Sequence, residues 1–159
     1  MNFKKTPYLI GLFIVLISGW ACNSDDDQAI NSIRGTWEVT SITSIYGQFV
    51  ENGFNPSETI TETGALGFFN FSNDAVAFEF TRNDTLYSGN DIWSITSEKV
   101  NAGFTQETKY NLIIENHFLF EVNFGDGTKN SERNAESATF IESPDIGFGA
   151  LIELELEKR

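Results

Sequence analysis

From about residue 36 to the C-terminus, apolar and polar residues alternate along the chain with a period of two. This period is typical of β-strands that bury one face and expose the other to water. Because each such strand has one wet face, the pattern predicts an antiparallel sheet rather than a parallel one. The segments that follow the pattern are 36–45, 66–72, 75–82, 91–97, 108–115, 118–124, 136–142 and 149–158.

The connections between these segments differ in length. Residues 73–74 (Asn-Asp) and 116–117 (Asn-His) are typical of tight hairpin turns. Residues 83–90 are polar and are predicted to form a turn as well. Residues 46–64 alternate poorly and contain Gly, Asn and Pro-Ser, so we predict a long loop there. A loop of this length inside a compact domain is commonly functional or disordered.

The number of strands limits the architecture to two choices. Eight alternating strands can close into an up-and-down barrel or divide into a β-sandwich. A closed barrel removes the exposed strand edges that promote aggregation, whereas a sandwich keeps them. The fold class is therefore all-β, and the alternation by itself leaves both arrangements open.

The first 21 residues have a different pattern. Lys4 and Lys5 form a short basic head, residues 8–17 are uncharged and almost wholly apolar, and small residues dominate 18–21. This order is typical of a secretory signal peptide. The apolar run is about half of the roughly 20 residues that cross a bilayer as a helix. We therefore predict a signal peptide over 1–21, with a short uncleaved anchor helix as the alternative.

The only cysteine, Cys22, directly follows this segment. A single thiol leaves no disulfide within the chain. The junction resembles the lipobox of bacterial lipoproteins, in which the cysteine is acylated and becomes the mature N-terminus. The resemblance implies a lipid-anchored protein of the cell outer membrane. Stable residence needs more than one acyl chain, which a triacylated cysteine supplies.

An acidic run follows the cysteine. It resembles the surface-export signal of Bacteroidota lipoproteins and consists of Ser24, Asp25, Asp26 and Asp27. This likeness implies exposure on the cell surface, with the periplasmic face as the alternative location and an ordinary solvated linker as the alternative role for the aspartates. We expect residues 22–29 to form a flexible, acylated, acidic tether and residues 30–159 to form one domain.

The charge of the chain restricts its partners. The formal net charge is −13, and the predicted signal peptide carries only basic charges, so the mature chain is more acidic still. Such a protein is repelled by anionic lipid and by a phosphate backbone. We therefore expect no nucleic-acid partner and expect membrane contact to be made by the N-terminal acyl chains alone.

Motifs for chemistry are weak in this sequence. The single histidine, His117, falls in a predicted turn, where a solvent-facing or structural role is the simpler interpretation. The sequence contains no nucleophile motif, paired histidine ligands or phosphate-binding loop. We predict that the protein is not an enzyme and has no catalytic residues, metal site or cofactor.

Residues 33–42, IRGTWEVTSI, carry a family resemblance. They resemble the opening strand of lipocalin-like domains, whose G-x-W signature falls here on Gly35 and Trp37. The likeness extends over residues 30–159, with a short turn before the motif and hairpins running to a last strand near the C-terminus. It implies a single eight-stranded antiparallel up-and-down barrel.

The same resemblance implies how the two ends of the barrel are covered. The tryptophan closes one end, and a basic residue of the last strand covers its ring through a cation–π contact. Lys158 and Arg159 are the candidates, and alternation places Lys158 on the face of Leu156 and Arg159 on the other face. Residues 47–64, within the loop after the first strand, would form a lid over the open end, with Phe49 and Phe54 as possible plugs.

The inner face of such a barrel is a candidate ligand pocket. It would be mostly apolar with a few polar groups, as ligand pockets are, and the resemblance implies a small apolar ligand. An eight-stranded barrel is also narrow enough to be filled by its own side chains. In that case the protein would be a structural or interaction lipoprotein that contacts another envelope component. The candidate lining residues are Val39, Ser41, Thr43, Phe78, Phe80, Trp93 and Phe120.

Overall fold

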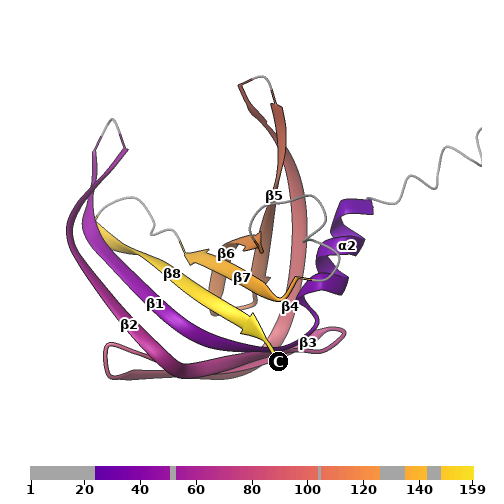
Figure 1. Cartoon of the computed structure of the whole chain (residues 1–159), viewed down its shortest axis with the longest axis horizontal. Helices are drawn as coiled ribbons and strands as arrows, with labels where there is room; N and C mark the ends of the chain where they lie inside the picture. The colour runs from indigo at the N-terminus through magenta and orange to yellow at the C-terminus, as the bar shows by residue number, and fades with distance from the viewer. Residues whose placement is uncertain (1–23, 51–52, 104, 126–134, 143–147) are drawn as a thin grey trace, which may run out of the picture.

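The structure, a computed structural model, describes residues 24–50, 53–103, 105–125, 135–142 and 148–159 (Figure 1). Eight antiparallel strands form a closed barrel in sequence order, and the first strand pairs with the last. The predicted up-and-down barrel is confirmed, and the sandwich is not formed. The elements are α2 (Ser24–Ile33), β1 (Gly35–Val50), β2 (Gly53–Phe71), β3 (Ala75–Arg82), β4 (Thr85–Ala102), β5 (Thr105–Ile114), β6 (Phe118–Phe124), β7 (Ser137–Glu142) and β8 (Phe148–Lys158).

Apolar side chains from alternate positions of the strands fill the centre of the barrel. Phe69 is fully buried, and its ring lies 5.4–6.3 Å, between centroids, from five other phenylalanine rings. These rings belong to Phe71, Phe78, Phe80, Phe120 and Phe140. The described core extends from Ala29 to Leu156, so every residue that contributes to it lies in the chain from residue 24 onward.

The two ends of the barrel differ. Helix α2 precedes β1, and its residues Ala29 and Ile33 belong to the buried core, so α2 covers the end at which β1 begins. We call this the closed end. The β3–β4 and β5–β6 turns lie at the other end, which we call the open end. In Figure 1, α2 and the far ends of the paired strands β1 and β2 lie on opposite sides of the molecule.

The long loop predicted over residues 46–64 is wrong. β1 and β2 continue through this region as a paired ribbon, with Tyr46 opposite Glu58 and Phe49 opposite Phe54. A Cβ atom on Gly47 would overlap the backbone carbonyl of Asn55 and lie 2.7 Å from the Phe54 ring, so this glycine allows β2 to approach closely and does not mark a turn. The proline in β2 is tolerated because this part of β2 pairs with β1 alone among the described strands.

The polar turn predicted over residues 83–90 is much shorter than expected. Asn83 and Asp84 have φ angles of 49° and 60°, which is the backbone of a two-residue hairpin turn, and β4 begins at the next residue. The other two predicted hairpin turns, at 73–74 and 116–117, are confirmed.

A β-bulge in β1 changes which residues face the interior. Val39 pairs with Leu156 of β8, but the next pair joins Ser41 to Glu155, so that Thr40 is an extra residue. An extra residue reverses the inward and outward faces of the strand beyond it. The bulge has no distinct sequence signal, and strict alternation therefore fails at this point.

The bulge corrects two members of the predicted pocket. Beyond it, Ile42 and Ser44 are buried, and they occupy the inner face of β1. Ser41 and Thr43 instead pair with the outward-facing glutamates of β8 and belong to the outer face, where Ser41 is nevertheless covered (8% exposed). The Thr43 hydroxyl forms an exposed hydrogen bond with the hydroxyl of Thr61 on β2 (3.2 Å). Neither Ser41 nor Thr43 lines the barrel interior.

Residues 24–29, expected to be part of a flexible tether, form the first turns of α2 instead. Acidic residues in a first turn interact favourably with the helix dipole. The Asp26 carboxylate accepts a hydrogen bond from the backbone N–H of Ser97 in β4 (2.7 Å), and Asp25 forms an ion pair with Lys99 (3.0 Å). The helix is therefore fixed to the barrel. Cys22 and the predicted signal peptide lie outside the described residues.

Candidate functional site

The closed end of the barrel is sealed around Trp37. Its side chain is fully buried, and the indole N–H donates a hydrogen bond to the carbonyl oxygen of Ile33 (2.6 Å). The ammonium of Lys158 lies 5.2 Å from the centroid of the Trp37 ring and donates to the carbonyl oxygen of Ser32 (2.7 Å). Burial lowers the pKa of Lys158. These contacts join the last turn of α2 to both β1 and β8.

Gly35 and Arg159 complete this end. Gly35 has a φ angle of 114°, and a Cβ atom there would lie 3.2 Å from the side chain of Lys158, so the lysine stem can lie close to the backbone. Arg159 points outward and forms an ion pair with Glu38 (2.7 Å), which lowers the pKa of that carboxyl through a hydrogen bond. Of the two candidate basic residues, Lys158 is thus the one that covers Trp37.

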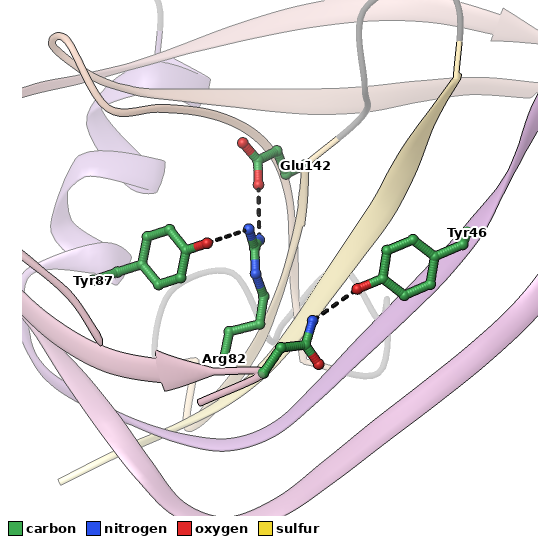
Figure 2. Close-up of polar contacts among 5 residues, drawn as sticks. Tyr46, Arg82, Tyr87 and Glu142 are labelled. Atoms are coloured by element: carbon green, nitrogen blue, oxygen red, sulfur yellow. Dashed lines mark hydrogen bonds and ion pairs between the residues drawn. The ribbon is translucent and has the colours of Figure 1, made fainter. Parts of the chain in front are cut away.

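Four polar side chains gather at the open end, each from a different strand. Figure 2 shows Tyr46 of β1, Arg82 of β3, Tyr87 of β4 and Glu142 of β7; the Tyr87 hydroxyl is directed to the Arg82 guanidinium, and the Tyr46 hydroxyl approaches from the opposite side to bond with Asn83. Position 82 follows the inward-facing position 80 by two residues, so alternation directs it inward as well. Separate strands therefore bring these groups into one region of the barrel interior.

Arg82 is at the centre of this group. Its Nη2 donates a hydrogen bond to the hydroxyl of Tyr87 (2.9 Å), and its guanidinium carbon lies 4.6 Å from the centroid of the same ring. Its Nη1 lies 3.5 Å from a carboxylate oxygen of Glu142. The Arg82 side chain is only 18% exposed and that of Glu142 is 30% exposed.

Glu142 is a weak partner for this arginine. Burial raises the pKa of the Glu142 carboxyl, and the nearby charge of Arg82 opposes that rise without cancelling it. The desolvation of the carboxylate therefore outweighs its attraction to the guanidinium.

A second set of contacts links the β1–β2 ribbon to the β3–β4 turn. The side-chain amide of Asn83 donates to the hydroxyl of Tyr46 (2.7 Å), and the backbone N–H of Asn83 donates to the carboxylate of Glu62 (2.9 Å). Both contacts depend on the tight turn at Asn83, because a longer turn would move its backbone away from β1 and β2. They fix the position of Tyr46 beside the Arg82 group.

Aromatic rings lie directly below these polar groups. The Tyr87 ring stacks on Phe80 with centroids 5.2 Å apart and an interplanar angle of 10°. Phe80 is almost fully buried, and Phe118 lies 5.8 Å from it between centroids. The open end therefore combines an aromatic floor, formed by Phe80, Tyr87 and Phe118, with the Arg82 guanidinium, which lies over the Tyr87 ring and donates to its hydroxyl.

The remaining predicted pocket residues occupy the packed core. Five of them are buried and belong to one hydrophobic cluster, namely Val39, Phe78, Phe80, Trp93 and Phe120. Trp93 packs against Phe71 (5.3 Å between centroids) and donates its indole N–H to the carbonyl oxygen of Ser72 (3.1 Å). The structure brings these residues together, but they contact one another and the rings around Phe69.

His117 has a local structural role. Its ring lies edge-on to Phe78 (5.0 Å between centroids), and its Nε2 lies 3.6 Å from a carboxylate oxygen of Asp91. Within the described parts of the chain, no group of three or more His, Cys, Asp or Glu side chains is arranged to hold a metal ion. The helix in these parts is too short and too polar to cross a membrane.

The open-end residues were not predicted from the sequence, although part of the signal was present. Arg82 follows Phe80 by two residues and Glu142 follows Phe140 by two, so alternation places both on the inner face. Tyr87 was assigned to a turn. Tyr46 could not be assigned to the inner face without knowledge of the bulge in β1.

Comparisons with protein-family models, with curated proteins and with solved structures give no match for this chain.

Proposed function

We propose that this protein is a lipid-anchored binding module of the bacterial cell envelope that holds a small, largely apolar molecule at the open end of a lipocalin-like barrel. The observation that carries the proposal is the combination at that end of an aromatic floor with a few inward-facing polar groups, Arg82, Tyr46 and Tyr87. Ligand sites are typically apolar and contain a small number of polar groups that orient the ligand.

The difference between the two ends supports this assignment. The closed end is sealed by α2, Trp37 and Lys158, and the rings around Phe69 are packed against one another. A ligand would therefore be held above Phe80 and not in the deeper part of the barrel, where the pocket was first expected. We therefore place the proposed ligand site at the open end of the barrel.

The position of α2 is compatible with an anchor at Cys22. Two residue steps separate Cys22 from Ser24, where the helix begins, and they span at most about 7 Å. Because α2 is fixed to the closed end, acyl chains on Cys22 would lie near that end. The open end would then face away from the anchoring bilayer, toward the exterior in an outer-membrane lipoprotein exposed on the cell surface.

Two measurements test the proposal. Metabolic labelling with a fatty-acid analogue should label the wild-type chain in cells, and Cys22→Ser should abolish both the label and recovery in the membrane fraction. Native mass spectrometry of the chain from residue 24 should show a bound apolar molecule after incubation with a fatty acid or a long-chain alcohol. An unlabelled wild-type protein contradicts the anchor, and an unchanged mass contradicts the binding module.

A second function is favoured by the outer wall. Ile113 of β5 and Leu119 of β6 are paired across the strands and are 40% and 59% exposed, and Ile92 of β4 is 54% exposed. Apolar residues on an outer wall are a feature of interaction surfaces. In this alternative the barrel is filled and contacts another envelope protein. Replacing Ile113 and Leu119 with Thr should then abolish the contact in crosslinking experiments on intact cells and leave ligand binding unchanged.

A further inference from the structure

One edge of β2 has no neighbouring strand over much of its length. β1 pairs with β2 from Gly53 to Phe71, whereas β3 pairs only with residues 67–71. Among the described strands, none pairs with residues 57–65 on the side away from β1, and we call this range the β2 edge. Every residue of the β2 edge except Glu62 is exposed. Its backbone N–H and C=O groups that point away from β1 are therefore available to an added strand.

The composition of the β2 edge favours the addition of a strand. Its sequence, SETITETGA, contains four β-branched residues, which favour extended pairing. Exposed edges that avoid pairing commonly carry Lys or Pro, and this range contains neither. The nearest turn does not replace a partner strand, because Asn83 contacts the inward-facing side chains of Tyr46 and Glu62 and so holds the β3–β4 turn on the inner face of the β1–β2 ribbon.

The β2 edge is complementary to itself in one antiparallel register. Thr61 then lies opposite Thr61 of a second copy, and a two-fold axis passes between them. Thr59 lies opposite Thr63 in this register, and threonine pairs across antiparallel strands are stabilising. Glu58 lies opposite Gly64. The glutamate therefore faces a residue without a side chain and not another carboxylate.

The neighbouring registers are less favourable. Centring the pair on Thr61 places Glu62 opposite Ile60. Centring it on Ile60 would place Glu58 opposite Glu62, and like charges directly opposite each other are destabilising. Centring it on Thr59 would bring Pro56, which has no backbone N–H, into the paired segment. Charge and backbone chemistry thus select the register at Thr61.

We propose that the β2 edge pairs with the β2 edge of a second copy of this chain, antiparallel and centred on Thr61. The same surface serves both copies, so the interface closes on itself and stops at a dimer. The full chain carries a formal net charge of −13, and the repulsion between two such copies is screened by salt. The dimer is therefore tighter at high ionic strength, whereas a basic partner strand would bind more weakly there.

Cysteine crosslinking in the Cys22→Ser chain, whose only native cysteine is replaced, tests the register. Thr61→Cys should form an intermolecular disulfide under mild oxidation, because opposed residues of antiparallel strands have Cα atoms about 4.5–5.5 Å apart. Thr63→Cys is the matched control on the same face of β2. Its two copies would lie four residues apart along the strands, about 13 Å, which is too far for a disulfide. Crosslinking through Thr63→Cys alone, or through neither variant, would overturn the proposal.

Sedimentation velocity of the Cys22→Ser chain gives an independent result. The dissociation constant of the dimer should fall severalfold between about 0.05 M and about 0.5 M NaCl. Thr61→Lys opposes two ammonium groups across the two-fold axis and should raise this constant about fivefold. Asn70→Lys adds the same charge to an exposed position at which β2 pairs with both β1 and β3, and it should leave the constant near that of the parent chain.

Three outcomes of the sedimentation experiment would overturn the proposal. The first is a chain that remains monomeric at high salt. The second is a dimer that Thr61→Lys leaves intact, which would place the interface on another face of the barrel. The third is a monomer that binds a synthetic peptide of alternating Lys and Thr, which would assign the β2 edge to a basic partner strand.

Discussion

The ammonium of Lys158 lies 5.2 Å from the centre of the Trp37 ring and reaches across it to the carbonyl oxygen of Ser32. One side chain from the last strand thus holds the first strand and the end of α2 together. The contact is local, but it joins the two strands that close the barrel. Its removal should therefore affect the stability of the whole fold.

We expect Lys158→Met to lower the free energy of unfolding by about 1–3 kcal/mol, because it removes the cation–π contact and leaves the Ser32 carbonyl without its donor. Methionine retains most of the apolar stem, so the loss reports on the ammonium. Urea unfolding of the chain from residue 24 measures it. Arg159→Met is the control, because this neighbouring cation points outward to Glu38, and its unfolding midpoint should stay near that of the wild type.

Alanine substitutions at Gly67 and Gly64 separate two costs of an added side chain, namely backbone strain and steric overlap with neighbouring atoms. Both have positive φ angles, 151° and 122°. A Cβ atom on Gly67 would overlap the carbonyl oxygen of Glu79 and the backbone of Phe80, whereas one on Gly64 would meet nothing within 4 Å. Gly64→Ala should cost about 1–3 kcal/mol from strain alone. Gly67→Ala should cost clearly more and should prevent β2 from pairing normally with β3. Similar unfolding midpoints for the two variants would contradict this account of Gly67.

Alternation predicted the strands well where short turns bound them. The predicted ranges 75–82 and 118–124 coincide with β3 and β6, because each of these strands follows a short turn and regular pairing keeps the inward and outward positions in step. The same argument failed in β1 and in the β1–β2 ribbon. Glycine and proline in this region predict a loop by residue type, but Gly47 and Pro56 lie opposite each other in paired strands. Gly47 allows β2 to approach β1 closely, and Pro56 lies where β2 pairs with β1 alone among the described strands.

The candidate site was harder to predict than the fold. Its members come from four strands, so their proximity depends on the closure of the barrel and on the bulge at Thr40. The sequence alone directs Arg82 inward, but it does not show which groups lie beside it. The prediction that Ser41 and Thr43 line the pocket is wrong for the same reason, because the bulge turns both residues outward.

Because of the bulge at Thr40, we expect substitutions at two neighbouring residues of β1 to change the stability by very different amounts. Thr43→Lys places a charge on the outer face beside Glu153 of β8, and stability should change by less than about 0.5 kcal/mol. Ser44→Lys places a charge in the buried inner face and should destabilise the barrel by several kcal/mol or prevent folding. Thermal unfolding followed by circular dichroism distinguishes the two. The opposite order would show that β1 alternates without a bulge.

The contact between Asp26 and the backbone of Ser97 predicts a local change in hydrogen exchange. β3 pairs with β4 only as far as Ile92, and α2 lies beside the edge that follows. We expect Asp26→Ala to increase amide exchange at Ser97 and at the first turn of α2, and to leave the β5 and β6 amides unchanged. Asp27→Ala is the matched control, because Asp27 is exposed. Equal exchange at Ser97 in the two variants would argue against an α2 that is fixed through Asp26.

The raised pKa of Glu142 predicts how this residue changes stability with pH. Burial favours the protonated carboxyl in the folded protein, so its folded pKa lies above the ordinary value of 4.5. The stability that Glu142 contributes is thus fully present below pH 4.5 and is lost as the pH rises through the folded pKa. Wild-type protein should therefore gain stability relative to Glu142→Gln as the pH falls through this window, and urea unfolding at several pH values measures the difference.

Glu38→Gln is a control of opposite sign, because Arg159 lowers the pKa of Glu38. Wild type should lose stability relative to that variant as the pH falls. A Glu142 difference with the sign of the Glu38 control would mean that the ion pair with Arg82 outweighs the desolvation of the Glu142 carboxyl.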